Sequence, residues 1–149
     1  FLPMISRLGF IKEGNPAQPT VAGLLLFGKN PQILMPHAKI KADMKQDPES
    51  TEWDDIAEIE GNIFTQIKNA ESFLRRNLKA SAKIIGFERV EMPQLPLEAL
   101  REAIINALVH RDYAKTESEI MLHISGKKVI IESPGRLLAP LTVETIFGV

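Results

Sequence analysis

The chain has 149 residues, of which 44% are hydrophobic and 25% are charged, the composition of an ordinary globular domain. Its formal net charge of −1 argues against the overall attraction to nucleic acid or to membranes that a strongly basic protein has. The lack of cysteine excludes disulfides and thiolate metal sites and agrees with a cytoplasmic location. The longest apolar run, Val21 to Phe27, is too short to cross a bilayer.

The first part of the chain alternates short helical patterns with turns. Residues 2–11 have the apolar spacing of one or two helical turns, which Gly9 ends. Thr20 is placed to cap a helix from Val21 to Phe27 that Gly28 closes. Residues 37–45 alternate apolar and polar side chains and predict a half-buried strand, and residues 53–59 predict a second one.

The remaining elements include the clearest helix of the chain. Apolar side chains recur with a 3.6-residue period over residues 61–79, which predicts a helix of about five turns. Residues 81–91 are a strand candidate, and residues 97–110 predict a second long helix. A hairpin is predicted where strands 120–124 and 128–131 flank Ser125-Gly126-Lys127, and Thr142 predicts the start of a last helix. This irregular alternation favours the α+β class.

The helix over residues 97–110 contains an unusual polar pair. Glu102 and Asn106 are four residues apart, so both side chains point the same way from an otherwise apolar segment. An asparagine oxygen suits Mg²⁺, and a glutamate one turn away can take a proton from a water molecule aimed at a phosphate. The simpler interpretation is a solvated helix face on which Arg101 is the salt-bridge partner.

More polar residues follow at the end of this helix, from His110 to Tyr113. His110 and Arg111 are favourably placed to cap a helix C-terminus, while His110 and Asp112 are also candidates for the same site as Asn106. A separate turn, Ser133-Pro134-Gly135, follows the second hairpin strand. Its glycine would let the backbone approach a flat ligand closely.

Taken together, these motifs resemble a known family. The spacing from Glu102 to Asn106 is similar to the N-box of the GHKL, or Bergerat, ATP-binding fold of gyrase, Hsp90, histidine kinases and MutL. More closely, the chain resembles divergent prokaryotic ATP-binding proteins described as transcriptional regulators or RecG-like proteins. In these a Schlafen/AlbA-type domain precedes the GHKL-like domain, and a winged helix often follows. The stretches that carry the resemblance are residues 19–32, 58–77, 95–113 and 129–137.

This resemblance implies a layer of helices on a mixed, mainly antiparallel sheet. Residues 1–34 would be a helical segment after a missing N-terminal domain, and residues 35–149 the first part of the ATP-binding domain, ending before its lid. ATP and Mg²⁺ would be the cofactors, with Asn106 as the metal ligand and Glu102 as the general base. The site would also include His110 and Asp112, and the turn of Ser133 and Gly135 would stand at the adenine.

The chain departs from the family pattern at this turn. Ser133 stands where the family has the aspartate that accepts the adenine amino group, and Leu137 replaces a second glycine. A neutral hydroxyl is a weaker acceptor than a carboxylate, and the glycine-rich lid is absent. We therefore expect weak or no ATP binding by this chain, and at most a Mg²⁺-dependent ATPase in a longer parent. The alternative is a degenerate, non-catalytic GHKL scaffold for dimerisation or DNA-linked interactions.

The expected partners are a nucleotide, DNA through other domains of the parent, a second copy in a homo-oligomer, and no membrane. His37 and His123 are isolated in the sequence, so we do not expect either to bind a metal. Two charged groups are interpreted as solvated surface rather than as a DNA patch or a metal site. The first is basic (Lys68, Arg75, Arg76, Lys79 and Lys83) and the second is acidic (Asp54, Asp55, Glu58 and Glu60).

Overall fold

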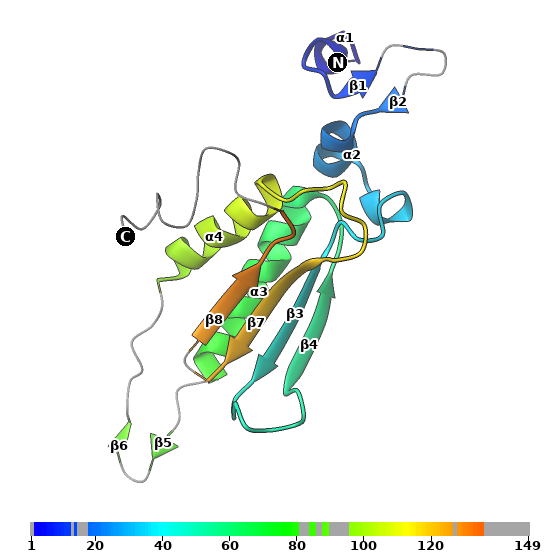
Figure 1. Cartoon of the computed structure of the whole chain (residues 1–149). Coiled ribbons are helices and arrows are strands. Elements are labelled where there is room, and N and C mark those ends of the chain that lie inside the picture. Colours follow the sequence, from blue (N-terminus) through cyan, green and yellow to red (C-terminus); the bar gives the residue numbers. More distant parts are fainter. Residues whose placement is uncertain are drawn as a thin grey trace, which may run out of the picture.

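A four-stranded sheet forms the centre of the molecule, in a computed structural model that describes residues 2–12, 14, 18–80, 84–85, 88–89, 96–126 and 128–135 (Figure 1). Its strand order is β4-β3-β7-β8, with β3 at Ile40–Lys45, β4 at Asp55–Ile59, β7 at Ile120–Ser125 and β8 at Lys128–Glu132. The β3–β7 pair is parallel and the two outer pairs are antiparallel. The expected α+β class and mixed sheet are confirmed.

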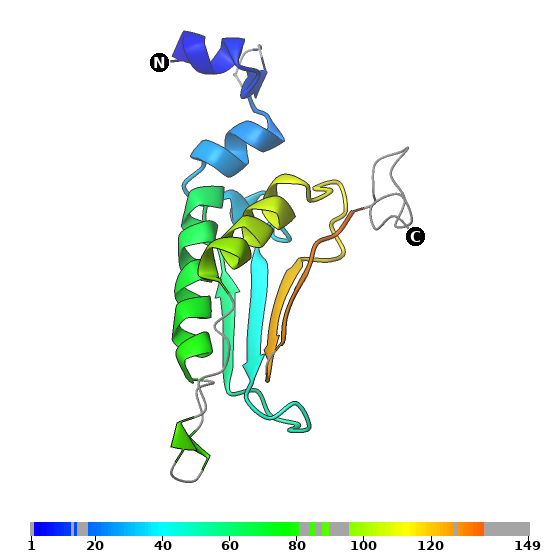
Figure 2. The same cartoon turned by 90° about the vertical axis from the view of Figure 1, so that its left-hand side faces the viewer.

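Both long helices cover the same face of this sheet, as Figure 2 shows. α3 spans Ile63–Ala80 and α4 spans Leu97–Val109. The two helices pack on each other as well as on the strands, α3 on β3 and β4 and α4 on β8. In the part of the chain that the structure describes, no helix lies on the opposite face. The sheet therefore has one buried and one open face, as antiparallel sheets commonly do.

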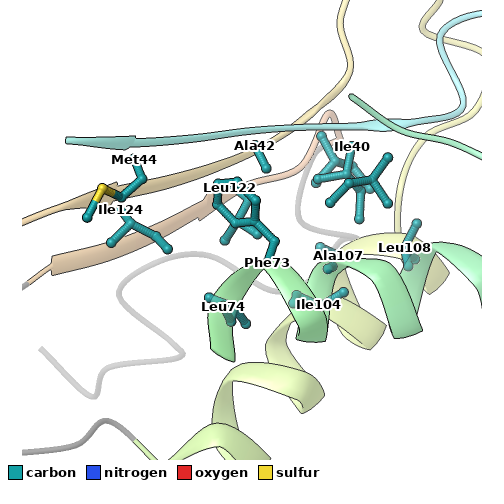
Figure 3. Close-up of a cluster of buried hydrophobic side chains, with 13 residues drawn as sticks. Ile40, Ala42, Met44, Phe73, Leu74, Ile104, Ala107, Leu108, Leu122 and Ile124 are labelled. Carbon is teal, nitrogen blue, oxygen red and sulfur yellow. The ribbon is translucent and has the colours of Figure 1, made fainter. Parts of the chain in front are cut away.

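The core lies between this sheet and the two helices (Figure 3). Every second residue of β3 and β7 points inward, which is the period that the sequence alternation predicts. Burying a large aliphatic or aromatic side chain stabilises the fold by roughly 1.5–3 kcal/mol. The buried cluster is built mainly from Ile40, Ala42, Met44, Phe73, Leu74, Ile104, Leu108, Ile120, Leu122 and Ile124.

Two glutamines attach the segment before β3 to this core. The Gln32 side-chain amide donates to the carbonyls of Ala38 at 2.6 Å and Gly61 at 3.0 Å, and its oxygen accepts from the Gly61 amide at 2.9 Å. Gln66 of α3 donates to the same two carbonyls at 3.0 and 2.9 Å. Gly61 has a φ of 100°, which favours glycine at the point where both side chains meet the turn before α3.

The N-terminal elements lie beyond one end of the sheet (Figure 1). They are α1 at Leu2–Arg7, β1 at Ile11–Lys12, β2 at Gln18–Pro19, α2 at Val21–Phe27 and the single 3₁₀ turn η1 at Pro31–Ile33. Thr20 caps α2 as predicted, because its hydroxyl accepts from the Gly23 amide at 3.1 Å. Gly28 also closes α2, in an extended rather than a left-handed conformation. A glycine is needed here because a Cβ would lie only 2.4 Å from the Leu24 carbonyl oxygen.

Several boundaries differ from the sequence-based expectations. β3 begins at Ile40 rather than at residue 37, and β4 begins at Asp55 rather than at residue 53, because pairing between the two strands starts only there. Of the strand candidate over residues 81–91, the structure describes two short paired strands, β5 at Ile84–Ile85 and β6 at Glu88–Arg89. The helix expected after Thr142 lies outside the described residues. Among the residues that are described, none of the helices combines the length and apolar character needed to span a membrane.

Asp55 joins β4 to α3 through charged hydrogen bonds. Its Oδ2 accepts from Arg76 Nη2 at 2.6 Å and from Asn77 Nδ2 at 2.7 Å. Partial burial pushes the pKa of this carboxyl up, but the hydrogen bonds from Asn77 and Arg76 prevail and hold the pKa below its ordinary value. Its stabilising contribution is therefore present above about pH 4 and is lost as the pH falls through the lowered folded-state pKa.

We expect Asp55→Asn to destabilise the fold by roughly 1–2 kcal/mol near neutral pH, because the charged acceptor is lost. The difference in unfolding free energy between the natural chain and this variant should narrow when urea denaturation is repeated at successively lower pH below about 4, because the natural carboxyl is increasingly protonated there. Glu52→Gln, at an exposed acidic position, serves as the control. A difference in unfolding free energy that does not change with pH would contradict the assignment of the acid sensitivity to Asp55.

Candidate functional site

The candidate site is built on the outward face of α4. Ile104, Ala107 and Leu108 face the core, so the same helical turns place Glu102 and Asn106 on the exposed side. Within the described parts of the chain, neither side chain has a hydrogen-bond or ion-pair partner. A carboxylate and a carboxamide one helical turn apart are thus available to a ligand, and neither carries the cost of being buried without a partner.

The simpler interpretation of this face is wrong in one respect, since Arg101 is not paired with Glu102. Arg101 Nε lies 3.7 Å from Oε2 of Glu71 on α3, and the other oxygen of that carboxylate, Oε1, accepts from Arg75 Nη2 at 2.6 Å. Arg101 therefore contributes to the contact between the two helices instead of neutralising Glu102. The reason is tertiary: the neighbouring helix offers a carboxylate that the local sequence of α4 does not reveal.

The last carbonyl groups of α4 are satisfied from three different parts of the chain. The His110 amide donates to the Asn106 carbonyl at 3.0 Å, so His110 ends the helix through its backbone. The Ser133 hydroxyl donates to the Ala107 carbonyl at 2.8 Å, and the Tyr113 hydroxyl donates to the Leu108 carbonyl at 2.8 Å. Carbonyls at a helix end need partners of this kind.

The turn after β8 docks on this helix end. Besides the Ser133 bond, the Asp112 amide donates to the Pro134 carbonyl at 2.8 Å. A Cβ on Gly135 would lie 3.7 Å from the His110 carbonyl oxygen, so the glycine sits at van der Waals distance from the same loop. The structure therefore brings together His110, Asp112, Ser133 and Gly135, next to the turn of α4 that carries Asn106. Glu102 lies one turn further back along the helix.

The bond from Ser133 has a consequence for what the turn can recognise. Its hydroxyl hydrogen is directed to the Ala107 carbonyl, so the oxygen offers only acceptor lone pairs to another group. Asp112 is also exposed, with one carboxylate oxygen accepting from the Ala114 amide at 3.1 Å. The turn and the helix end together present acceptors, which suits a ligand that carries an amino group.

Arg111 is a structural residue of the loop that follows α4. Its side chain is only 5% exposed, and Nη2 donates to the carbonyls of Lys115 at 3.0 Å and Ser118 at 2.6 Å. Burial lowers the pKa of this guanidinium, and the Tyr113 ring lies 4.8 Å away. The expectation that Arg111 caps the helix is therefore wrong, because its guanidinium binds the loop. The Tyr113 hydroxyl caps the helix end instead, by donating to the Leu108 carbonyl.

The two histidines named from the sequence both have partners. His123 of β7 lies 2.7 Å from an oxygen of Asp43 on the neighbouring strand β3, a contact between residues 80 positions apart. His37 Nε2 lies 3.2 Å from the Tyr113 carbonyl oxygen. Across the ranges described above, no three histidine or acidic side chains group together as a metal site.

Some members of the two charged groups make contacts within the described chain, while Lys83 lies outside the described residues. Arg75 and Arg76 pair with Glu71 and Asp55 at 2.6 Å each, and Lys39 pairs with Glu58. These ion pairs lie on the surface of the molecule, as the interpretation of a solvated face implies. Two hollows of the described surface, of ≈450 and ≈500 Å³, lie away from α4, one beside Gln32 and Gly61 and one beside Met4 and Leu8.

Comparison with known proteins supports the fold. No protein-family model and no curated protein matches the sequence. The DIP2311 protein from Corynebacterium diphtheriae has a similar structure, with a TM-score of 0.60 and 24% sequence identity. The similarity covers 95% of this chain and 28% of DIP2311, so the chain spans just over a quarter of that protein. At this identity the likeness shows a shared fold and nothing about activity.

Tyr113→Phe removes one of the side-chain hydroxyls that hold the end of α4. We expect it to destabilise the fold by about 1 kcal/mol near neutral pH, because the Leu108 carbonyl loses its donor. Burial raises the pKa of the Tyr113 hydroxyl. The nearby Arg111 charge lowers this pKa, but it offsets the effect of burial only in part. This contribution is present below about pH 10 and is lost as the pH rises through the folded-state pKa.

The natural chain should therefore lose more stability than Tyr113→Phe when urea denaturation is repeated at alkaline pH. Tyr113 is the single tyrosine of the chain, so the absorbance of tyrosinate reports its ionisation directly. A phenol that titrates in the folded protein as a free tyrosine does would contradict the buried, hydrogen-bonded arrangement.

Proposed function

We propose that the protein binds ATP together with Mg²⁺ at the end of α4. The observation that carries this proposal is the docking of the Ser133–Gly135 turn on the helix end. It places an acceptor and a glycine beside the turn of α4 that exposes the unpaired Asn106 side chain. The resemblance of the sequence to GHKL proteins supports the identity of the ligand.

The residues present fit this ligand. The Asn106 carboxamide is exposed and can supply one oxygen to Mg²⁺, which in nucleotide sites takes most of its ligands from phosphates and water. When bound, the metal neutralises phosphate charge. Glu102, on the same face, would accept a proton from a water molecule near those phosphates. This arrangement needs no cluster of carboxylates.

The adenine end would be recognised by the docked turn. Because the Ser133 oxygen has only lone pairs left, it can accept a hydrogen bond from the 6-amino group of adenine. Gly135 has no side chain to block the face of the ring, and the His110 and Asp112 segment lies beside it. A serine gives a weaker bond than an aspartate would, so the affinity should be low.

The wider role is proposed from the sequence resemblance alone. In this role the protein would be a cytoplasmic transcriptional regulator, in which a longer chain hydrolyses ATP and contacts DNA through other domains. One observation favours a second candidate, a scaffold of the same fold that binds no nucleotide. The Ser133 hydroxyl and the Asp112 amide are both used to fasten the turn to α4, which is a sufficient structural role for them.

A titration of the isotope-labelled chain with Mg-ATP, followed by nuclear magnetic resonance, separates the two candidates. ATP binding predicts shifts confined to the end of α4 and the Ser133 turn, with a dissociation constant on the order of 1 mM. Inosine triphosphate, which has an oxygen in place of the 6-amino group, should bind several-fold more weakly, because two acceptors would then face each other.

Variants identify the residues involved. Asn106→Ala should remove the dependence of binding on Mg²⁺, while Asn30→Ala, which removes another exposed carboxamide just before η1, should leave it unchanged. Glu102→Gln should alter the affinity by less than about twofold, since a general base contributes to the reaction and not to binding. An absence of shifts at saturating Mg-ATP would reject the proposal and leave the scaffold.

A further inference from the structure

The strand β8 has one unpaired edge within the described sheet. It pairs with β7 on one side, and the order β4-β3-β7-β8 places its other side at the boundary of the sheet (Figure 1). The pairing with β7 runs through five consecutive positions without a bulge, and β8 contains no proline. An edge of this regular kind exposes a row of backbone donors and acceptors that another strand can bind.

The sequence of β8 is complementary to itself. It reads Lys128-Val129-Ile130-Ile131-Glu132, so an antiparallel copy centred on Ile130 sets each lysine opposite a glutamate. The same register sets Val129 opposite Ile131 and Ile130 opposite its own copy. Both oppositely charged and β-branched pairs favour antiparallel pairing, and a two-fold axis produces each off-axis pair twice.

The burial of these side chains agrees with this arrangement. Lys128, Ile130 and Glu132 point to the open face, where Ile130 is 46% exposed. In the described part of the chain, Lys128 and Glu132 have no ion-pair partner, although most other charges on this sheet are paired. Val129 and Ile131 point to the other face, where they are partly buried against the core below α4.

We propose that β8 binds β8 of a second copy of this chain in antiparallel register, with the two-fold axis at Ile130. The sheet then continues across the dimer, with four described strands from each copy. The pairing satisfies the edge groups of β8, joins two Lys128–Glu132 pairs on the open face, and extends the apolar row of Val129 and Ile131 on the core face. It does not depend on nucleotide binding.

Sedimentation velocity over a range of concentrations tests the dimer, with no nucleotide present. The natural chain should shift from monomer to dimer as its concentration rises. Lys128→Glu gives a strand with two acidic ends and Glu132→Lys a strand with two basic ends, so each should weaken self-association by about tenfold or more. Lys29→Glu, an exposed charge reversal away from the sheet, should have no effect.

The decisive measurement mixes the two single variants. An acidic-ended strand opposite a basic-ended strand restores both attractive pairs, so the mixture should form a heterodimer at concentrations at which each variant alone is mainly monomeric. The double variant Lys128→Glu/Glu132→Lys should also recover self-association. Circular dichroism confirms that each variant is folded.

Three outcomes would overturn the proposal: a natural chain that stays monomeric, single variants that dimerise as well as the natural chain, or a mixture that stays monomeric. The first would mean that the edge is free or is covered by another strand, and the second that the copies meet through another surface. The third would mean that the charge pairs do not set the register.

Discussion

The parallel pairing of β3 with β7 is the constraint on which the rest of the structure depends. This pairing joins two segments that are about 80 residues apart in the sequence. Ile40 lies opposite Ile120 at one end and Lys45 opposite Ser125 at the other. Two parallel neighbours cannot be joined by a tight turn, so the chain between them must cross over one face. The crossover contains both α3 and α4, and the apolar side chains that β3 and β7 point to that face require both helices to pack there.

This constraint decides which side of α4 reaches solvent. With Ile104 and Leu108 buried against the strands, Glu102 and Asn106 must point outward, whatever their chemical role. The hairpin of β7 and β8 then returns the chain to the C-terminal end of α4, where the Ser133 turn fastens to the Ala107 carbonyl. The candidate site is thus a result of topology: two segments that are distant in the sequence, α4 with its following loop and the Ser133 turn, meet because the sheet has this order.

The sequence allowed the prediction of those features that depend on neighbours along the chain. The 3.6-residue period located α3, and the alternation around Gly126 located the hairpin of β7 and β8 within one residue at each outer end. The Thr20 cap could also be predicted, since donor and acceptor are three residues apart. Contacts between distant residues could not, because nothing local marks them. Asp43 meets His123 across 80 residues, Gln32 meets Gly61 across 29, and Ser133 meets Ala107 across 26.

The same reasoning explains why the candidate site was only partly predictable. Glu102 and Asn106 could be named because a helical spacing of four is a local property, and the structure shows both residues exposed. The roles of Arg111 and Tyr113 could not be assigned, since adjacent polar residues at a helix end diverge: one binds the following loop and the other turns back to the helix. The structural bond of the Ser133 hydroxyl is compatible with the recognition role that we propose for it. By donating to Ala107 it fixes the helix end and at the same time turns its lone pairs outward, so the two roles do not compete for the same atom.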